Sequence, residues 1–314
     1  MTKRILITGG AGFIGSHLAR AHIAEGDEVH VLVRPAASLR ADRVHRNTIV
    51  HRVDLRDYAA LLSCLAATRA QVIYHLATDA GRNRTLPDLS DLDSLTTDLD
   101  NVLRLAAAAA NAPAKPDCFI TAQSIAVYGN GLSPSIEDQR EAPLAPYTAS
   151  MVAAGHYLSV MQPRLPFSIL HARFGLTFGP GQASSFFIPW LIERCLAGEP
   201  SEIRTPEDRR DFVHVEDVTA GLIAMSRTPL HTGTIINLSC GKAPTVREVA
   251  ELIIELTGAP RGLVTLARMK PDYVRGRALC ARTERARELL GWRPRVSLRE
   301  GIARMVSRQV AQRV

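Results

Sequence analysis

Glycines near the start of the chain have the spacing of a phosphate-binding turn. Residues 3–15 read Lys-Arg-Ile-Leu-Ile-Thr-Gly-Gly-Ala-Gly-Phe-Ile-Gly. Gly10, Gly12 and Gly15 therefore satisfy G-x-G-x-x-G, and Gly9 in place of Gly10 gives the wider G-x-x-G-x-x-G. In such a motif one glycine permits the turn, one lets the backbone approach a pyrophosphate, and one lets a helix lie close to a strand. The predicted chemistry is the binding of a dinucleotide, with its phosphates facing the N–H groups of a helix start.

The elements that must position these glycines are also visible in the sequence. Arg4 to Thr8 is a short, apolar, β-branched run that predicts a buried strand, and Ser16 to Glu25 predicts a helix. A second strand, Glu28 to Val33, is followed by Arg34. A carboxylate at that place favours NAD, whereas a guanidinium can accept the 2′-phosphate of NADP. Arg34 therefore favours NADP over NAD.

Strands and helices alternate through the rest of the first half. Further strands are predicted at 48–53, 71–76, 117–121 and 167–174, and helices over the stretch ending at Thr68, at 95–111 and at 147–161. This alternation is typical of an α/β fold with a doubly wound parallel sheet, which binds ligands at the carboxyl ends of its strands. The polar stretch 82–94 and the proline- and glycine-rich stretch 130–146 are candidate active-site loops.

The composition of the chain indicates which kind of protein it is and which kind of ligand it binds. With 314 residues, 46% of them hydrophobic and 22% charged, the chain suits a globular protein with one large core or two unequal domains. We expect no membrane span, no signal peptide and a cytoplasmic location, because there is no run of eighteen apolar residues and a strand begins at residue 4. The five cysteines are scattered singly, so we expect core thiols and no metal site. The net charge of +7 comes mostly from dispersed arginines, which favours an anionic small molecule over nucleic acid.

A series of further motifs follows in order along almost the whole chain. They are Thr8 to Gly15, Asp54-Leu55-Arg56-Asp57, His75-Leu76-Ala77, Ser124 before Val127-Tyr128-Gly129, Tyr147 at a helix start, Arg173 with Phe178-Gly179-Pro180-Gly181, 210–218 (RDFVHVEDV) and 290–294 (LGWRP). Together they resemble the extended short-chain dehydrogenases, the NAD(P)-dependent nucleotide-sugar epimerase and dehydratase family. The resemblance implies a Rossmann NAD(P)-binding domain formed by 1–173 and 212–239, and a smaller α/β substrate-binding domain formed by 174–211 and 240–314. It also implies a homodimer that pairs through the helices at 95–111 and 147–161.

The resemblance assigns roles to particular residues. Tyr147 would take or give the proton while a hydride moves between nicotinamide and a sugar carbon, and Ser124 would hydrogen-bond the same oxygen. The residues expected to contact NAD or NADP are Gly9, Gly12, Phe13, Ile14, Gly15, Arg34, Asp54, Leu55, Leu76, Ala77, Tyr147 and Met151. The residues expected to contact the substrate, a nucleotide diphosphate sugar, are Arg82, Ser124, Leu176, Arg210, Arg268 and Arg275.

One catalytic position departs from the family pattern. The fourth residue after the tyrosine is usually lysine and is Met151 here. A tyrosine with pKa about 10 needs about 4 kcal/mol of selective phenolate stabilisation to titrate near pH 7, and a thioether carries no positive charge. Three explanations remain open. Arg82, Arg84 or His75 supplies the charge; Tyr147 acts as a neutral acid in the reductive direction; or catalysis is largely lost.

The substrate side departs as well. Leu176 stands where relatives commonly have an asparagine that contacts the nucleotide sugar, and Arg282 stands where an aspartate is frequent. Arg210, which pairs with the diphosphate in the family, is kept. The functions left open are an epimerase or dehydratase, an NADPH-dependent 4-ketoreductase, a reductase of another carbonyl compound, and a cofactor-binding member that is not catalytic.

Overall fold

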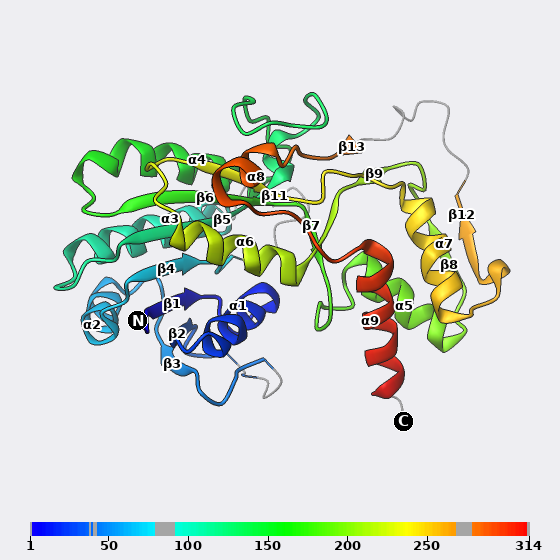
Figure 1. The fold of residues 1–314 in the computed structure, drawn as a ribbon, viewed down its shortest axis with the longest axis horizontal. Coiled ribbons are helices and arrows are strands. Elements are labelled where there is room, and N and C mark those ends of the chain that lie inside the picture. The colour runs from blue at the N-terminus through cyan, green and yellow to red at the C-terminus, as the bar shows by residue number, and fades with distance from the viewer. Residues whose placement is uncertain (1, 38, 40–42, 79–91, 268–277, 313–314) are drawn as a thin grey trace.

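A computed structural model describes residues 2–37, 39, 43–78, 92–267 and 278–312 (Figure 1). Its main feature is a seven-stranded, fully parallel sheet in the order β11-β6-β5-β4-β1-β2-β3. The strands are β1 (Arg4–Thr8), β2 (Glu28–Val33), β3 (Ile49–Arg52), β4 (Val72–His75), β5 (Cys118–Ser124), β6 (Ser168–Phe174) and β11 (Ile235–Leu238). The order reverses between β1 and β4, which is the place where doubly wound sheets bind ligands. The predicted fold class is confirmed.

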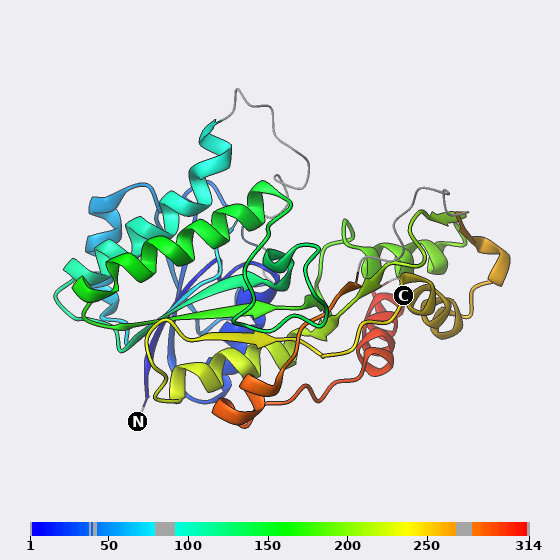
Figure 2. The same ribbon diagram turned by 90° about the horizontal axis from the view of Figure 1, so that it is seen from above.

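Helices cover both faces of this sheet, as Figure 2 shows, with α3 and α4 on one face and α6 on the other. The helices of these layers are α1 (Phe13–Ala24), α2 (Tyr58–Thr68), α3 (Leu92–Asn111), α4 (Pro146–Met161) and α6 (Val215–Arg227). Ile5 and Ile7 belong to the apolar cluster on the α1 and α6 side, whereas Leu6 between them belongs to the cluster on the α2, α3 and α4 side. A strand buried on both faces must be apolar throughout, which is why β1 reads as a continuous hydrophobic run.

The smaller domain surrounds a third apolar cluster that includes Phe178, Leu191, Ile253 and Ile302. Its helices are α5 (Phe187–Ala197), α7 (Val246–Thr257) and α9 (Leu298–Ala311), and α8 (Glu284–Leu290) packs against α6 and β11. Three two-stranded parallel ladders pair β7 (Leu176–Phe178) with β10 (Phe212–His214), β8 (Ser201–Ile203) with β12 (Val264–Leu266), and β9 (Arg209–Arg210) with β13 (Ala278–Leu279). Short 3-10 turns are η1 (Ile125–Tyr128), η2 (Gln162–Arg164) and η3 (Arg261–Leu263).

Two details differ from the sequence-based expectation. The helix after the glycines begins at Phe13 and not at Ser16, because Gly12 already has the extended backbone of an N-cap. Within 212–239, α6 and β11 join the layers of the main sheet, whereas β10 pairs with β7 outside it. None of the described helices is both long and apolar enough to cross a membrane.

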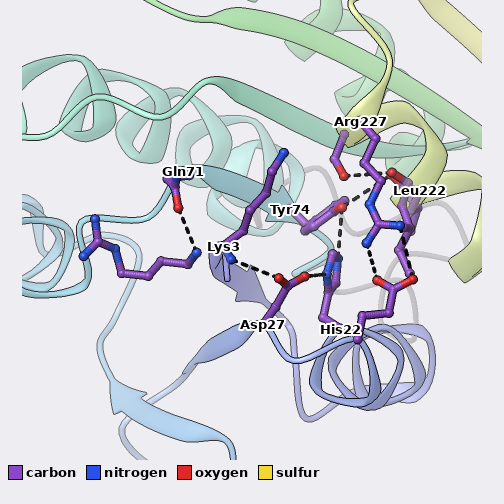
Figure 3. A network of polar contacts seen from close by, with 11 residues as sticks. Lys3, His22, Asp27, Gln71, Tyr74, Leu222 and Arg227 are labelled. Carbon is purple, nitrogen blue, oxygen red and sulfur yellow. Dashed lines mark hydrogen bonds and ion pairs between the residues drawn. The ribbon is translucent and has the colours of Figure 1, made fainter. Parts of the chain in front are cut away.

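A polar network joins the residues before β1 and β2 to α1 and to β4 (Figure 3). His22, near the end of α1, lies 2.8 Å from an Asp27 oxygen through Nδ1 and 3.1 Å from the Tyr74 hydroxyl through Nε2. Asp27 also accepts the backbone N–H of Lys3 at 3.0 Å. His22 and Tyr74 are buried, and their polar atoms bond to one another, so this network ties α1 to β4.

Candidate active site

The glycine turn is folded so tightly that several of its positions, Gly9 and Gly15 among them, exclude a side chain. Gly9 has a φ of +69°, and a Cβ there would lie 2.9 Å from the backbone N of Ala77. A Cβ on Gly15 would lie 2.3 Å from the Gly9 carbonyl oxygen. Both distances are far below van der Waals contact, so the sequence spacing reflects a steric need. The turn also rests directly on Leu76 and Ala77, which were predicted to contact the cofactor.

The start of α1 has the properties of a phosphate site. Gly12 is its N-cap and is exposed, and among the described residues no side chain caps this end and none in its first turn is acidic. The backbone N–H groups of Phe13, Ile14 and Gly15 belong to the first turn, where an α-helix offers no internal acceptor. Such N–H groups, with the positive end of the helix dipole, suit a pyrophosphate. The residues present therefore fit a dinucleotide cofactor.

Arg34 and Asp54 lie at the ends of β2 and β3, beside this turn. Arg34 is exposed, as a residue that meets a ribose or a phosphate must be. Arg56 donates to both oxygens of Asp54, at 3.1 and 2.7 Å, and with help from Arg34 lowers the pKa of Asp54 to about 2. Leu55 between them is buried. The roles of these residues toward the cofactor stay predictions.

Ser124 and Tyr147 stand at the carboxyl side of the sheet. Ser124 ends β5, and its Oγ accepts the backbone N–H of Ala126 at 3.2 Å, which begins the 3-10 turn η1. Tyr147 lies in the first turn of α4, directly after Pro146, whose fixed φ suits a helix start. Both residues are partly exposed, and α4 packs against β5 and η1.

Met151 lies one turn further along α4, and its side chain faces an apolar cluster. It packs against a group formed by Ile125, Val127, Tyr128 and Ala281. A lysine there would place a charged ammonium beside this apolar surface, whereas the methionine thioether packs against it. The position expected to carry the positive charge is therefore apolar in the folded protein.

A buried chain of hydrogen bonds, which sequence reasoning missed, binds the backbone of α4 at Met151. The Gln123 side chain donates from Nε2 to the Met151 carbonyl oxygen at 3.2 Å and accepts from Arg173 Nε at 3.1 Å. Arg173 is also paired with Glu141. The available signal was a glutamine next to Ser124 in an otherwise small and apolar strand.

His75 is not a replacement for the missing lysine, contrary to one of our sequence-based alternatives. It is buried at the end of β4 with Nδ1 2.9 Å from the Thr8 hydroxyl. Burial lowers the pKa of His75 to about 4, so the ring is neutral at pH 7. The other two candidates, Arg82 and Arg84, lie outside the described residues.

The predicted substrate residues are spread between the two domains. The Arg210 guanidinium lies 2.5 Å from Asp208 and donates to the Arg209 carbonyl oxygen. Leu176 begins β7, and its side chain packs against the cluster of the smaller domain. Arg268 and Arg275 lie outside the described residues. Their contacts with a substrate stay predictions.

The loop at 130–146 links the reaction region to the smaller domain. Ser135 donates its N–H to the Cys280 carbonyl at 2.9 Å, and its own carbonyl accepts from Arg282 N at 2.8 Å. Arg282, which stands where an aspartate is frequent in the family, therefore contacts this loop through its backbone N–H. A role of this loop at the active site stays a prediction.

Comparison with known proteins agrees with this arrangement. Residues 5–239 match the NAD dependent epimerase/dehydratase family. The UDP-glucose 4-epimerase of Mycolicibacterium smegmatis is 32% identical and is aligned over 96% of this chain and 97% of its own. The UDP-glucose 4-epimerase of Thermus thermophilus in complex with NAD has a TM-score of 0.83, 28% identity, and coverage of 97% of this chain and 98% of that one.

A second similar solved structure contains a nucleotide sugar as well as NAD. MoeE5 in complex with UDP-glucuronic acid and NAD has a TM-score of 0.85, 29% identity, and coverage of 98% of this chain and 99% of that one. The family match spans well over half of the chain and includes the glycine turn, Ser124 and Tyr147. The chain therefore belongs to the NAD dependent epimerase/dehydratase family, whose enzymes act on nucleotide sugars.

Proposed function

We propose that this enzyme moves a hydride at a sugar carbon of a nucleotide diphosphate sugar, as an epimerase or dehydratase, with Tyr147 as the acid and base. The observation that carries the proposal is the placement of Ser124 at the end of β5 and Tyr147 in the first turn of α4, which packs on β5. Two hydroxyls bordering one region can hold the same substrate oxygen and exchange its proton. When bound, the nicotinamide supplies the hydride acceptor and donor.

Met151 makes the phenolate form of Tyr147 costly. The ammonium that would favour the phenolate is replaced by an apolar contact with the cluster around Tyr128. Proton removal by Tyr147 should then need a higher pH than in relatives that keep the lysine. The buried chain of hydrogen bonds from Arg173 through Gln123 fixes the helix turn, so the tyrosine is still held in position.

The substrate class rests on the relatives and on the arginines. The relatives are named for UDP-glucose, and MoeE5 binds UDP-glucuronic acid. Arg210, partly exposed on β9, has the planar guanidinium that suits a diphosphate. We therefore expect a nucleotide diphosphate sugar, with Arg210 on its phosphates.

The second candidate is an NADPH-dependent sugar 4-ketoreductase. Two observations favour it. Arg34 is exposed at the end of β2, where it can meet a 2′-phosphate, and Met151 matters little to a tyrosine that works as a neutral acid. If Ser124 and Tyr147 do not act on a substrate, the chain is a member of the family that binds the cofactor but has weakened catalysis.

Cofactor release and substrate addition distinguish these functions. The purified protein is denatured and its nucleotide identified, and intact protein is then mixed with UDP-glucose, UDP-glucuronic acid and a dTDP-sugar. Retained NAD together with an epimerised or dehydrated product supports the proposal, with Tyr147→Phe as the inactive control. Oxidation of added NADPH by a 4-ketosugar supports the ketoreductase. If Tyr147→Phe keeps the measured activity, the proposed chemistry is wrong.

We also propose that two copies pair through α3 and α4. These helices pack side by side, and Tyr157 and Val160 on α4 are 55% and 80% exposed. Exposed apolar side chains on a helix surface are suited to a partner. Light scattering should show a dimer that Val160→Asp weakens. Val310→Asp, on the separate surface of α9, is the control and should leave the dimer intact.

A further inference from the structure

Two contacts join the cofactor-binding layers to residues 179–182, which follow β7 and are called the β7 loop below. His17 Nε2, on α1, lies 2.9 Å from the Pro180 carbonyl oxygen. The Arg43 guanidinium, from the stretch between β2 and β3, donates to the Gly181 carbonyl oxygen. Segments that are more than a hundred residues apart in sequence therefore meet beside the glycine turn.

The β7 loop has a fixed shape of its own. Gly179 has a φ of +149°, and a Cβ there would lie 2.7 Å from Val215 Cγ1, at the start of α6. Gln182 closes the turn, because its N–H donates to the Gly179 carbonyl at 3.2 Å and its Nε2 donates to the Thr177 carbonyl at 2.8 Å. The loop thus presents the Pro180 carbonyl to α1 and the Gly181 carbonyl to Arg43, while Gly179 packs closely against the start of α6.

The His17 contact has a defined donor. Burial lowers the pKa of His17, so the ring is neutral at pH 7. The Pro180 carbonyl accepts only, which requires the proton on Nε2 and leaves Nδ1 bare. The same ring meets Phe13 edge-on with 5.7 Å between centroids. Phe13 belongs to the first turn of α1, so the bond lies one turn away from the predicted pyrophosphate site.

We infer that His17 and Arg43 form a clasp that retains the dinucleotide. In doubly wound folds the cofactor crosses the switch point of the sheet, here between β1 and β4. Arg43 comes from the stretch beyond β2, on one side of that point, and the β7 loop follows β6, on the other. The clasp joins the segments that flank the two halves of the cofactor, so release requires both bonds to part. The inference depends on cofactor binding and is independent of the reaction proposed above.

The test is a release rate. Protein loaded with NADH or NADPH, whichever it binds, is mixed with an excess of the oxidised dinucleotide, and the decay of bound-cofactor fluorescence gives the rate. His17→Phe keeps the aromatic contact with Phe13 and removes the donor, whereas His17→Gln keeps an N–H donor. Arg43→Ala removes the second bond. Arg52→Ala is the matched control, because Arg52 donates to the Pro35 and Ala37 carbonyls within the same stretch.

We expect His17→Phe and Arg43→Ala each to speed release about 3- to 10-fold, the effect of one net hydrogen bond. His17→Gln and Arg52→Ala should stay within about 2-fold of the parent protein, as hydrogen-bond retention predicts. Unchanged release in both His17→Phe and Arg43→Ala overturns the clasp. Equal acceleration by Arg52→Ala also overturns it, because general loosening of that stretch would then be the cause. No sugar enters the measurement, so an inactive enzyme with a normal clasp counts against the proposed reaction alone.

Discussion

Polar residues lie near both ends of the parallel strands, but they differ in how accessible they are. Towards the amino ends, the buried His22 bonds both to the partly buried Asp27 and to the hydroxyl of the buried Tyr74, and burial raises the pKa of Tyr74. At the carboxyl ends, Ser124 and Tyr147 are partly exposed. A histidine, an aspartate and a tyrosine in contact thus stabilise the fold at one end, and chemistry is expected where polar groups remain accessible.

The two tyrosines give the largest expected effect. Tyr147→Phe should lower turnover by about 10²- to 10⁴-fold, the usual loss when a general acid or base is removed, and leave the free energy of unfolding nearly unchanged. Tyr74→Phe should do the reverse. It removes the hydroxyl partner of His22 and should cost about 1 to 3 kcal/mol of stability with little change in turnover per folded molecule. Urea unfolding and initial rates on both variants check the comparison, which fails if Tyr74→Phe is the inactive one.

Buried neutral histidines should make the protein sensitive to acid. Burial lowers the pKa of His75 and of His171 to about 4, below the unfolded value of 6.5. The unfolded chain therefore binds more protons in this window, so stability is full above pH 6.5 and falls as the pH drops towards 4, by about 3 kcal/mol per histidine. Urea midpoints measured from pH 7 to 4.5 should show this slope.

His75→Asn separates the two roles considered for that residue. It should flatten the stability slope, since one neutral imidazole is removed, and leave the pH profile of turnover unchanged. A shifted pH profile would show that His75 belongs to the reaction after all.

Met151→Lys should increase the reactivity of the accessible Tyr147, because it places a positive charge one helical turn away. If Tyr147 works as a base, we expect the pH optimum to move down by about one unit or turnover near neutrality to rise about tenfold, equivalent to about 1.4 kcal/mol. Met151→Leu keeps the apolar contact with Val127 and Tyr128 and should change little. Equal rates for both variants over the whole pH range would mean that no phenolate is formed.

The smallest effect is expected at Arg34. Arg34→Ala should reduce the preference for NADP over NAD by about 3- to 5-fold, as the loss of an exposed charge-assisted contact predicts. Arg56→Ala removes a neighbouring exposed guanidinium that pairs with Asp54 and should leave the ratio alone. Binding constants for both cofactors give the ratio, and an unchanged ratio in Arg34→Ala would remove the argument for NADP.

Local patterns in the sequence predicted the main sheet and the glycine turn. The apolar run of β1 and the spacing of Gly9 and Gly15 act over a few residues, so they can be read directly. Contacts between segments that are distant in sequence could not be predicted from such local patterns. The pairing of β10 with β7, the neutral state of His75 and the hydrogen bond from Gln123 to the Met151 carbonyl all depend on what the fold brings beside each residue.

The three parallel ladders of the smaller domain have a consequence for how the chain is made. Synthesis proceeds from the amino terminus, and all strands of the main sheet except β11 are complete once Phe174 has emerged. The smaller domain instead joins β8 to β12 and β9 to β13 and packs α9 into its apolar cluster, so it cannot be completed before residue 311 has been made. Such distant pairings are slow to form. A ribosome-bound chain should therefore hold a nearly finished main sheet next to a smaller domain that is still unfolded.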